Sequence, residues 1–226
     1  VNAEDTYGQL TTFEVLTALA FYHFRQAGVT HAAIEVGLGG RLDATNVLSP
    51  QVCVITSISM DHTEVLGDSL ARIAAEKAAI VKPGVPVVCG PQPPEALEVV
   101  LETARRQEAP VTLVGRDVTW QAQAHDIHGQ RLAVRTSAAT YALTIPLLGA
   151  FQRENAAAAV AACEALAQRG VTLSPEAIVS GLARVSWPGR LEVLGTGPLL
   201  VVDGAHNPYS IACLAQAVRE TFSFRR

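Results

Sequence analysis

The sequence predicts an α/β fold: a mostly parallel sheet wrapped by helices, an antiparallel β insertion, and the start of a second, Rossmann-like α/β domain. Two observations support this. Short apolar runs alternate with segments of helical periodicity in the first half of the chain, which is the pattern of strand–helix units. After Arg116 apolar runs follow one another around a His128-Gly129 turn, as antiparallel strands do.

Strands and helices alternate over the first half of the chain. The first helix begins at a potential capping box formed by Thr11 and Glu14 and stops at Gly28. We expect Asp68 to cap a second helix that ends at Lys82. Four apolar segments are expected to form buried strands, at 31–36, 51–57, 85–89 and 111–114, and a third helix spans 95–107.

The second half begins with the antiparallel insertion and ends in a new strand–helix unit. A break at Trp187-Pro188-Gly189 follows the insertion and its helices, and we place a domain boundary there. The two domains are 1–187 and 188–226. Strands are expected at 118–123, 131–145 and 199–202, and helices at 152–169, at 174–184 and from about Ser210.

Composition excludes several classes of protein. The chain has 226 residues, of which 49% are hydrophobic and 17% charged, and its formal net charge is -4. This excludes wholesale disorder and a nucleic-acid binder that relies on electrostatics. No apolar run reaches the roughly 18 to 20 residues of a membrane-spanning helix, and the start has no secretory pattern. We expect neither a nucleic-acid nor a membrane partner.

The four cysteines lie far apart and include no CxxC pair. We therefore expect reduced, mostly buried side chains, a cytoplasmic location and no zinc site. These cysteines are Cys53, Cys89, Cys163 and Cys213.

Polar residues lie near the carboxyl ends of several expected strands or just after them. Ligands of open α/β sheets bind at the carboxyl ends of strands, so these positions are candidates for a site. They are Glu35, Asp43, Asp61, His62, Asp203 and His206.

Four of these candidates have two interpretations on their residue type alone. Glu35 either binds a hard cation such as Mg²⁺ or pairs with an arginine or backbone amides. His62 is either a metal ligand or a hydrogen-bonded structural residue. Asp43 either belongs to a site or caps a turn. Asp203 either contacts a ribose or phosphate or caps the strand–helix turn.

Four further segments carry possible chemistry. Lys77, if buried, could react with carbon dioxide to form a carbamate; otherwise it is a solvated lysine beside Glu76. Asn155 either caps a helix or hydrogen-bonds a base, and Arg190 could bind a phosphate. The Gly37-Leu-Gly-Gly40 turn either cradles an anion or only bends the chain, and the sequence contains no GxxxxGK[ST] pattern.

Six segments in this order resemble one family. They are TTFE at 11–14, EVGLGGRLDATN at 35–46, SMDHT at 59–63, EKA at 76–78, WPGR at 187–190 and DGAHNP at 203–208. Together they resemble folylpolyglutamate synthase and dihydrofolate synthase, members of the Mur ligase superfamily.

The resemblance implies an ATP-dependent ligase of folate biosynthesis. It would join L-glutamate to the carboxylate of dihydropteroate or a reduced folate through an acyl phosphate, with ATP and Mg²⁺. The implied fold is a P-loop-NTPase-like central ATP-binding domain over 1–187, followed by the start of a glutamate-ligase domain at 188–226. The complete enzyme would be a cytoplasmic monomer.

The resemblance also implies roles for individual residues. Glu35 and His62 match magnesium ligands. Lys77 matches a carbamylated catalytic lysine, and His206 lies beside the ATP contacts. Those contacts are Asn155 to the base, Arg190 to a phosphate and Asp203 to the ribose, and the substrate-lining residues are Thr11, Thr12, Phe13, Glu14, Leu42, Asp43 and Ala44.

The family's Gly-Lys-Ser phosphate loop, its upstream magnesium-binding serines and most of its last domain have no counterpart in the sequence. We therefore expect the chain to be the middle of an enzyme, cut at both ends and inactive alone. One alternative is a non-catalytic remnant of the fold. Another is a Mur-type ligase with a different acceptor, against which the segment Leu42-Asp43-Ala44 argues.

Overall fold

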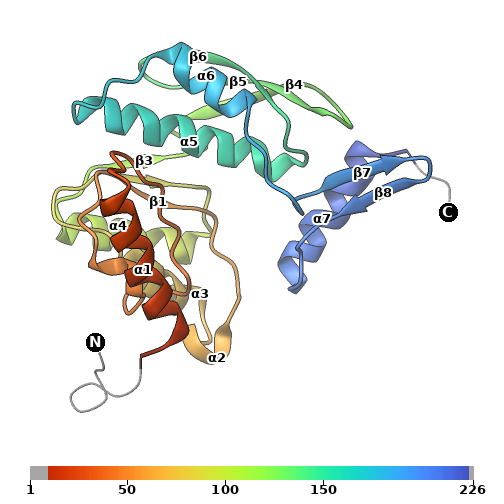
Figure 1. Ribbon diagram of the computed structural model, residues 1–226. Helices are drawn as coiled ribbons and strands as arrows, with labels where there is room; N and C mark the ends of the chain where they lie inside the picture. The colour runs from red at the N-terminus through yellow and green to blue at the C-terminus, as the bar shows by residue number, and fades with distance from the viewer. Residues whose placement is uncertain (1–9, 224–226) are drawn as a thin grey trace.

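The computed structural model describes residues 10–223 (Figure 1). Its N-terminal part holds a parallel and an antiparallel sheet, and its C-terminal part holds a two-stranded sheet. The N-terminal part consists of α1 (Thr12–Gln26), the 3-10 helix η1 (Ala44–Val47), β1 (Cys53–Ile55), α2 (Thr63–Leu66), α3 (Leu70–Ala78), β2 (Val87–Cys89), α4 (Pro94–Arg106), β3 (Val111–Leu113), β4 (Thr119–Asp126), β5 (Gly129–Arg135), β6 (Thr140–Ile145), α5 (Ala150–Gln168) and α6 (Pro175–Ala183). The C-terminal part consists of β7 (Glu192–Thr196), β8 (Leu199–Val202) and α7 (Pro208–Thr221).

The parallel sheet has the order β1-β2-β3 and is covered by helices on both faces. Val87 and Cys89 of the central strand β2 belong to the core formed with α3 and α4. Val88 points the other way and belongs to the core formed with α5. Because both faces of a central parallel strand are covered, all three residues of β2 are apolar and buried.

Helix α5 lies between the two sheets of the N-terminal part (Figure 1). One core joins Val88 of β2, Ala157 of α5 and Leu132 of β5. The small alanine side chains of α5 let both sheets approach the helix closely. The parallel sheet and the antiparallel insertion therefore share one hydrophobic core, and the predicted fold class is confirmed.

The antiparallel sheet β4-β5-β6 follows the predicted alternation, with one correction. The predicted strand 131–145 is two strands, separated by a turn. The hydroxyl of Thr136 accepts the N–H groups of Ala138 and Ala139 at 3.1 and 3.0 Å, and these bonds stabilise the turn. Sequence hydropathy missed the break because Ala138 and Ala139 are apolar.

The start of α3 is a second correction. Ser69, and not Asp68, is the N-cap, since its hydroxyl accepts the N–H of Arg72 at 3.3 Å. The Asp68 carboxylate instead pairs with the Arg72 guanidinium at 3.3 Å. The helix ends at Ala78, before Lys82. In contrast, the predicted capping box of Thr11 and Glu14 is present at the start of α1.

The predicted buried strand 31–36 is not a strand. Within residues 10–223 it pairs with no other strand, and Glu35 is exposed, while Ile34 and Val36 are only half-buried. A strand needs a hydrogen-bonded neighbour, and the first strand of the described sheet, β1, is bonded to β2 alone. The apolar character of this segment was therefore insufficient to predict its structure.

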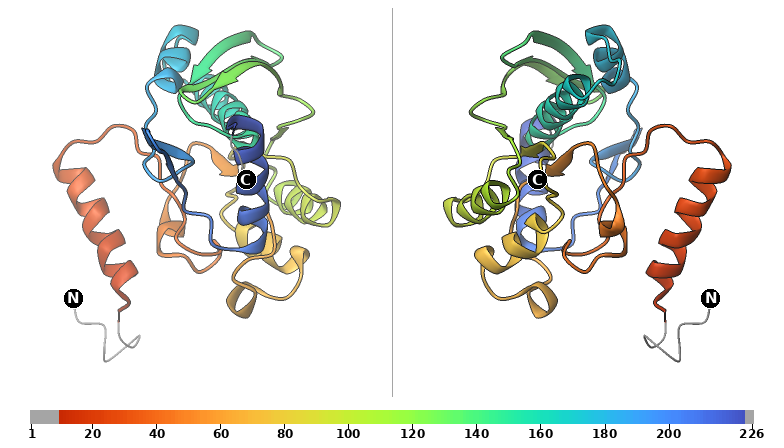
Figure 2. Two further views of the ribbon diagram at one scale, coloured as in Figure 1. Left: turned by 90° about the vertical axis from the view of Figure 1, so that its right-hand side faces the viewer. Right: turned by 90° about the vertical axis from the view of Figure 1, so that its left-hand side faces the viewer.

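Helix α1 stands apart from the other helices (Figure 2). Thr17 is its one buried residue, and Leu16, Leu19 and Tyr22 are each more than half exposed. It contacts the rest of the described chain at η1 and through Phe13, which packs against Gly37. None of the helices within residues 10–223 is long and apolar enough to cross a bilayer.

The C-terminal part begins with a strand that the sequence did not predict, β7. It pairs antiparallel with β8, whose range was predicted correctly, and α7 begins two residues before the predicted Ser210. A small core joins this part to the rest, because Leu191, Ala217 and Phe222 pack with Leu148. The last residues of the predicted domain 188–226 lie outside the described residues.

The turn Gly37-Leu-Gly-Gly40 packs against the end of α3. The N–H of Arg41 donates to the carbonyl of Glu76 at 3.0 Å, and the Arg41 guanidinium pairs with the Glu76 carboxylate at 2.9 Å. A Cβ on Gly40 would lie 2.7 Å from the same Glu76 carbonyl oxygen. Glycine is therefore required at position 40 by the closeness of two backbones.

We predict that Gly40→Ala lowers the free energy of unfolding by about 1–3 kcal/mol, the usual cost of overpacking. Chemical denaturation monitored by circular dichroism measures the change. Gly181→Ala is the matched control, because Gly181 lies in α6 with nothing within 4 Å of its Cβ position. That variant should gain about 0.5–1 kcal/mol. Equal stability of the Gly40→Ala variant and the unaltered chain would contradict the described packing.

Candidate functional site

The carboxyl end of β1 leads to a turn with a left-handed residue. His62 has φ 49° and ψ 39°, which costs a non-glycine residue ~1–2 kcal/mol. Oδ1 of Asp61 accepts the N–H of His62 at 2.9 Å. The carbonyl of His62 accepts the N–H groups of Val65 and Leu66, both at 2.9 Å, and so begins α2. Asp61 therefore stabilises the turn that presents His62.

The loop after β8 brings two predicted nucleotide contacts together. Oδ2 of Asp203 accepts the N–H of Leu191 at 2.8 Å, and Oδ1 accepts the N–H of Ala205 at 2.7 Å. Nη1 of Arg190 would be 3.1 Å from a Cβ placed on Gly204. The Arg190 guanidinium thus lies against the loop that Asp203 begins.

The same loop continues to the N-terminus of α7 and contacts the His62 turn. Nδ1 of the exposed His206 is 2.9 Å from the carbonyl oxygen of Gly204. Oδ1 of Asn207 accepts the N–H of Ser210 at 2.8 Å and caps α7. Nδ2 of Asn207 donates to Oδ2 of Asp61 at 3.0 Å. Two loops far apart in the sequence are therefore in direct contact.

Asn155 lies on the second turn of α5. It is exposed, and its Nδ2 donates to Oε1 of Gln152 at 3.0 Å. Burial raises the pKa of the neighbouring Glu154. Among the described residues no hydrogen bond joins Asn155 to Arg190 or Asp203, so the structure does not bring these three predicted contacts into one bonded group.

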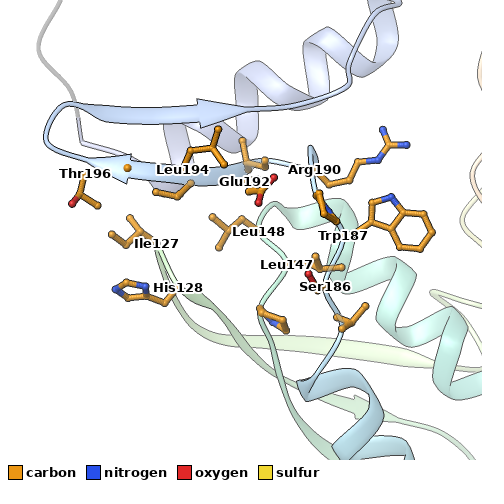
Figure 3. Close-up of a pocket in the computed structure, with 16 residues that line it drawn as sticks. Ile127, His128, Leu147, Leu148, Ser186, Trp187, Arg190, Glu192, Leu194 and Thr196 are labelled. Carbon is orange, nitrogen blue, oxygen red and sulfur yellow. The ribbon is translucent and has the colours of Figure 1, made fainter.

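A cavity of about 410 Å³ lies beside the segment that joins α6 to β7. Figure 3 shows Trp187 and Arg190 at one end of it, and Ile127, His128 and Thr196 at the other. Trp187, where the sequence predicts a domain boundary, therefore lines this cavity, which lies between the antiparallel sheet and the C-terminal part.

The predicted substrate-lining residues lie around the start of α1 and the nearby turn. Thr11 and Glu14 bond one another in the capping box, and Phe13 packs against Gly37. Helix α1 contacts η1, which Asp43 caps. Phe13 thus lies against the Gly37 end of the turn, and the Gly37 amide also bonds Asp43. The remaining members of the segments 11–14 and 42–44 are Thr12, which is exposed, Leu42, which is 81% exposed, and Ala44, which is half-buried.

Asp43 has the structural role that the sequence left open. Its carboxylate accepts the N–H of Leu38 at 2.9 Å, the N–H of Thr45 at 2.9 Å and the hydroxyl of Thr45 at 2.6 Å. Burial acts to raise the pKa of Asp43, but these bonds and one from the Gly37 amide outweigh it, and the pKa is lowered. Asp43 is therefore an ionised cap of the turn.

The two lysines have different environments. Lys77 is half-buried in the last turn of α3, close to the Gly37–Gly40 turn, and its carbamylation remains a prediction. Nζ of Lys82 donates to the carbonyl and the side-chain oxygen of Asn46 at 2.9 and 2.7 Å. Lys82 thus fixes the segment that follows the predicted substrate contacts, a role that the sequence did not predict.

The predicted magnesium ligands do not form a closed metal site. Glu35 is exposed, and the His62 side chain is 54% exposed. Within residues 10–223 no group of three or more His, Cys, Asp or Glu side chains could hold a metal ion. One carboxylate and one imidazole nevertheless suit Mg²⁺ in part, because this ion keeps several waters and is often held by one or two protein carboxylates together with substrate phosphates.

The contact between Asp61 and Asn207 was missed, since no sequence signal links residues 146 positions apart. Asp61 was a candidate only through its place at a strand end. All four cysteines are free; Cys53 and Cys89 are buried, as expected, whereas Cys163 and Cys213 are half-buried. Burial raises the pKa of the Cys53 and Cys89 thiols.

Comparison with known proteins places this geometry in a family. Residues 3–163 match the Mur ligase middle domain. A dihydrofolate synthase/folylpolyglutamate synthase of Bacillus subtilis is 40% identical over 224 residues, which are 97% of this chain and 52% of the relative.

Two solved structures agree. An FPGS–AMPPCP–folate complex superposes with a TM-score of 0.93 at 39% identity, covering 98% of this chain and 54% of the other. Mycobacterium tuberculosis folylpolyglutamate synthase with ADP superposes with a TM-score of 0.91 at 38% identity, covering 98% of this chain and 50% of the other. The chain thus spans about half the length of the relatives it matches. With its shared core, its Gly37–Gly40 turn and its loop at 203–208, the chain belongs to the Mur ligase family and is similar to its folylpolyglutamate and dihydrofolate synthases.

Proposed function

We propose that the complete protein containing this chain ligates L-glutamate to the carboxylate of dihydropteroate or a reduced folate, at the expense of ATP. The observation that carries the proposal is the direct contact between the His62 turn and the loop of Asp203, through Asp61 and Asn207. It brings the turn of His62, one of the two predicted metal ligands, next to the loop that holds Asp203 and His206. Relatives named as synthases of these two types support the choice of reaction.

The reaction has two steps. The folate or pteroate carboxylate attacks the γ-phosphorus of ATP, and ADP leaves. The amine of glutamate then attacks the acyl carbon; phosphate leaves, and the amine loses one proton. Phosphoryl transfer of this kind depends on positioning and charge neutralisation more than on a covalent protein nucleophile. Candidate residues of this chain such as Lys77, Arg190 and His206 are charged or polar and suit such positioning and charge neutralisation.

The nucleotide would be bound where the two parts of the chain meet. We assign the fork of Arg190 to a phosphate, Asp203 to the ribose and Asn155 to the base. The Arg190 guanidinium lies against the loop that Asp203 begins, which supports the first two assignments. His206, exposed beside them, would face the transferred phosphoryl group.

Glu35 and His62 would supply two donors to Mg²⁺, with the remaining ligands from phosphate and water. When bound, Mg²⁺ neutralises the charge that develops on the transferred phosphoryl group. The exposure of both side chains leaves them accessible to such a ligand.

The acceptor substrate would bind between the start of α1 and the turn at 42–44, through Thr11, Thr12, Phe13, Glu14, Leu42, Asp43 and Ala44. The exposed apolar side chains of Phe13 and Leu42 provide a surface for a flat pterin ring. We further propose the domain division 1–187 and 188–226, a monomeric complete enzyme, and a cytoplasmic location that suits free, buried cysteines.

The proposal is tested by incubating the complete protein with ATP, Mg²⁺, L-glutamate and either dihydropteroate or tetrahydrofolate. We expect one ADP and one new amide per turnover, with no ADP when glutamate or the pterin substrate is omitted. The formation of ADP with neither substrate present, or no product from either acceptor, would refute it. A cell-wall precursor included as a third acceptor separates this reaction from that of other Mur-type ligases.

We predict that Lys77→Ala in the complete protein lowers kcat by at least ~100-fold, the scale of losing one charge-stabilising group. Small carboxylic acids should restore part of the rate, because they replace the carbamate. Arg72→Ala is the control: it removes a cation from the same helix, and Arg72 is exposed. A near-normal rate of Lys77→Ala without added acid would contradict carbamylation.

We predict that Glu35→Gln raises the Mg²⁺ concentration for half-maximal rate by ~10–100-fold, because a neutral amide is a weaker ligand for a hard cation. Glu108→Gln serves as the control for loss of a carboxylate, because Glu108 is exposed just after the end of α4. An unchanged Mg²⁺ dependence of the Glu35→Gln variant would remove Glu35 from the metal site.

A further inference from the structure

We propose that Asp61 is a positioning residue, which fixes the His62 turn only when the N-terminus of α7 is docked against it through Asn207. This inference deepens the proposed function and rests on it for the link to Mg²⁺. The structural link between α7 and the His62 turn stands on the contacts alone.

Asp61 uses both carboxylate oxygens: Oδ1 bonds within its own turn, and Oδ2 bonds Asn207 and also lies 3.8 Å from Nε2 of His62. Oδ1 accepts the backbone N–H of His62 at 2.9 Å, and Oδ2 accepts Nδ2 of Asn207 at 3.0 Å. The side chain is about two-thirds buried, with an exposed fraction of 35%. A carboxylate held at both oxygens has one orientation, so the position of Asn207 determines how Asp61 presents Oδ1 to His62.

The turn that Asp61 supports needs such support. His62 is in the left-handed conformation, and no side chain caps α2, which is four residues long. A short helix with an uncapped start has little stability of its own. The bond from the His62 N–H to Asp61 therefore contributes to the conformation that presents the imidazole.

Asn207 is itself rigid. Its Oδ1 accepts the N–H of Ser210 at 2.8 Å, and the Ser210 hydroxyl accepts the Asn207 N–H at 3.1 Å, which completes a capping box. The amide group cannot turn without losing the cap, so Nδ2 stays directed at Asp61. The bond between Asn207 and Asp61 is thus fixed by the fold of α7.

Helix α7 is anchored along its length, which gives this contact a defined geometry. Ala217 packs in the small core with Leu148, and the carbonyl of Glu220 lies 3.1 Å from Nε2 of His125. Near its first turn, burial and then Cys213 raise the pKa of Tyr209, while the side chain of Ser57 acts to lower it. Tyr209 therefore neighbours the same loop after β1 that carries Asp61.

The consequence concerns the two predicted sites. Asn207 directly follows His206 and lies in the loop that begins at Asp203, so a shift of this loop moves Nδ2 away from Asp61. His62 then loses its fixed orientation. Docking of the C-terminal part would in this way order the metal-binding side chain at the moment when the nucleotide-binding residues arrive.

An exchange of the two side chains tests the pair. Asn207→Asp keeps the α7 cap but sets two carboxylates against each other, and Asp61→Asn sets two amide donors against each other. In the double variant, the amide introduced at position 61 would accept the His62 N–H through its oxygen. Its nitrogen would donate to the carboxylate introduced at position 207. Both hydrogen bonds would thus be restored, with position 61 now the donor and position 207 now the acceptor of the bond between them. Each single variant should lose the ordered His62 turn, and the double variant should restore it.

The first readout is hydrogen–deuterium exchange of residues 62–67, measured on the complete protein without ligands. We expect exchange about tenfold faster in each single variant, corresponding to the loss of one charge-assisted hydrogen bond, and a return to the original rate in the double variant. Ser174→Ala is the control, because it removes the N-cap of α6 and leaves Asp61 and Asn207 unchanged. Fast exchange that persists in the double variant, or unchanged exchange in both single variants, overturns the proposal.

The second readout is the Mg²⁺ dependence of ligation. We expect the half-saturating Mg²⁺ concentration to rise about tenfold in each single variant and to recover in the double variant, with kcat at saturating Mg²⁺ changed much less. Recovery of exchange with no change in Mg²⁺ dependence would overturn the positioning role toward His62. If the unaltered protein ligates no acceptor, the proposed function fails, and the exchange data alone decide whether α7 orders the turn.

Discussion

The structure depends on close packing around α5. This helix is covered by the parallel sheet on one side and by the antiparallel sheet on the other, and its buried residues are mostly alanine. A larger side chain at Ala157, which is fully buried, would force the two sheets apart. The first turns of α5 also lie where the C-terminal part docks, because Phe151 packs against the core of Leu148, Leu191 and Ala217. One helix therefore holds the two sheets together and contacts the core that anchors the C-terminal part.

Polar anchors then fix the segments that carry the site residues. Nε2 of the buried Gln130 donates to the carbonyls of Leu147 and Gly149 at 2.8 and 2.9 Å, just before α5, and Arg153 donates to its oxygen at 2.6 Å. Lys82 holds the segment after Asp43 in the same manner, through Asn46. These side chains hydrogen-bond backbone groups that are not paired in a helix or a sheet. A loop can acquire a defined geometry in this way without a neighbouring strand.

Local features of the chain were predictable, and non-local ones were not. The capping box of Thr11 and Glu14, the strand 199–202 and the alternation of strands and helices depend on neighbouring residues, and the structure contains all three. The segment 31–36 was wrongly predicted as a buried strand, because a strand also depends on a hydrogen-bonded partner that its own residues do not specify. Recognition of the family came from six separated motifs, whereas the bond between Asp61 and Asn207 could be found only in three dimensions. The structure places Phe13 against Gly37, and Arg190 against the loop that Asp203 begins, but the roles of these residues remain predictions.

We propose that these loops meet in order to activate a carboxylate with ATP. This is tested by oxygen transfer from a pteroate or folate substrate in which both oxygens of the reacting carboxylate are ¹⁸O. An acyl phosphate requires that one labelled oxygen from the carboxylate appear in the released phosphate at every turnover of the complete protein. Phosphate that contains no label, while the amide product still forms, would rule out the acyl phosphate.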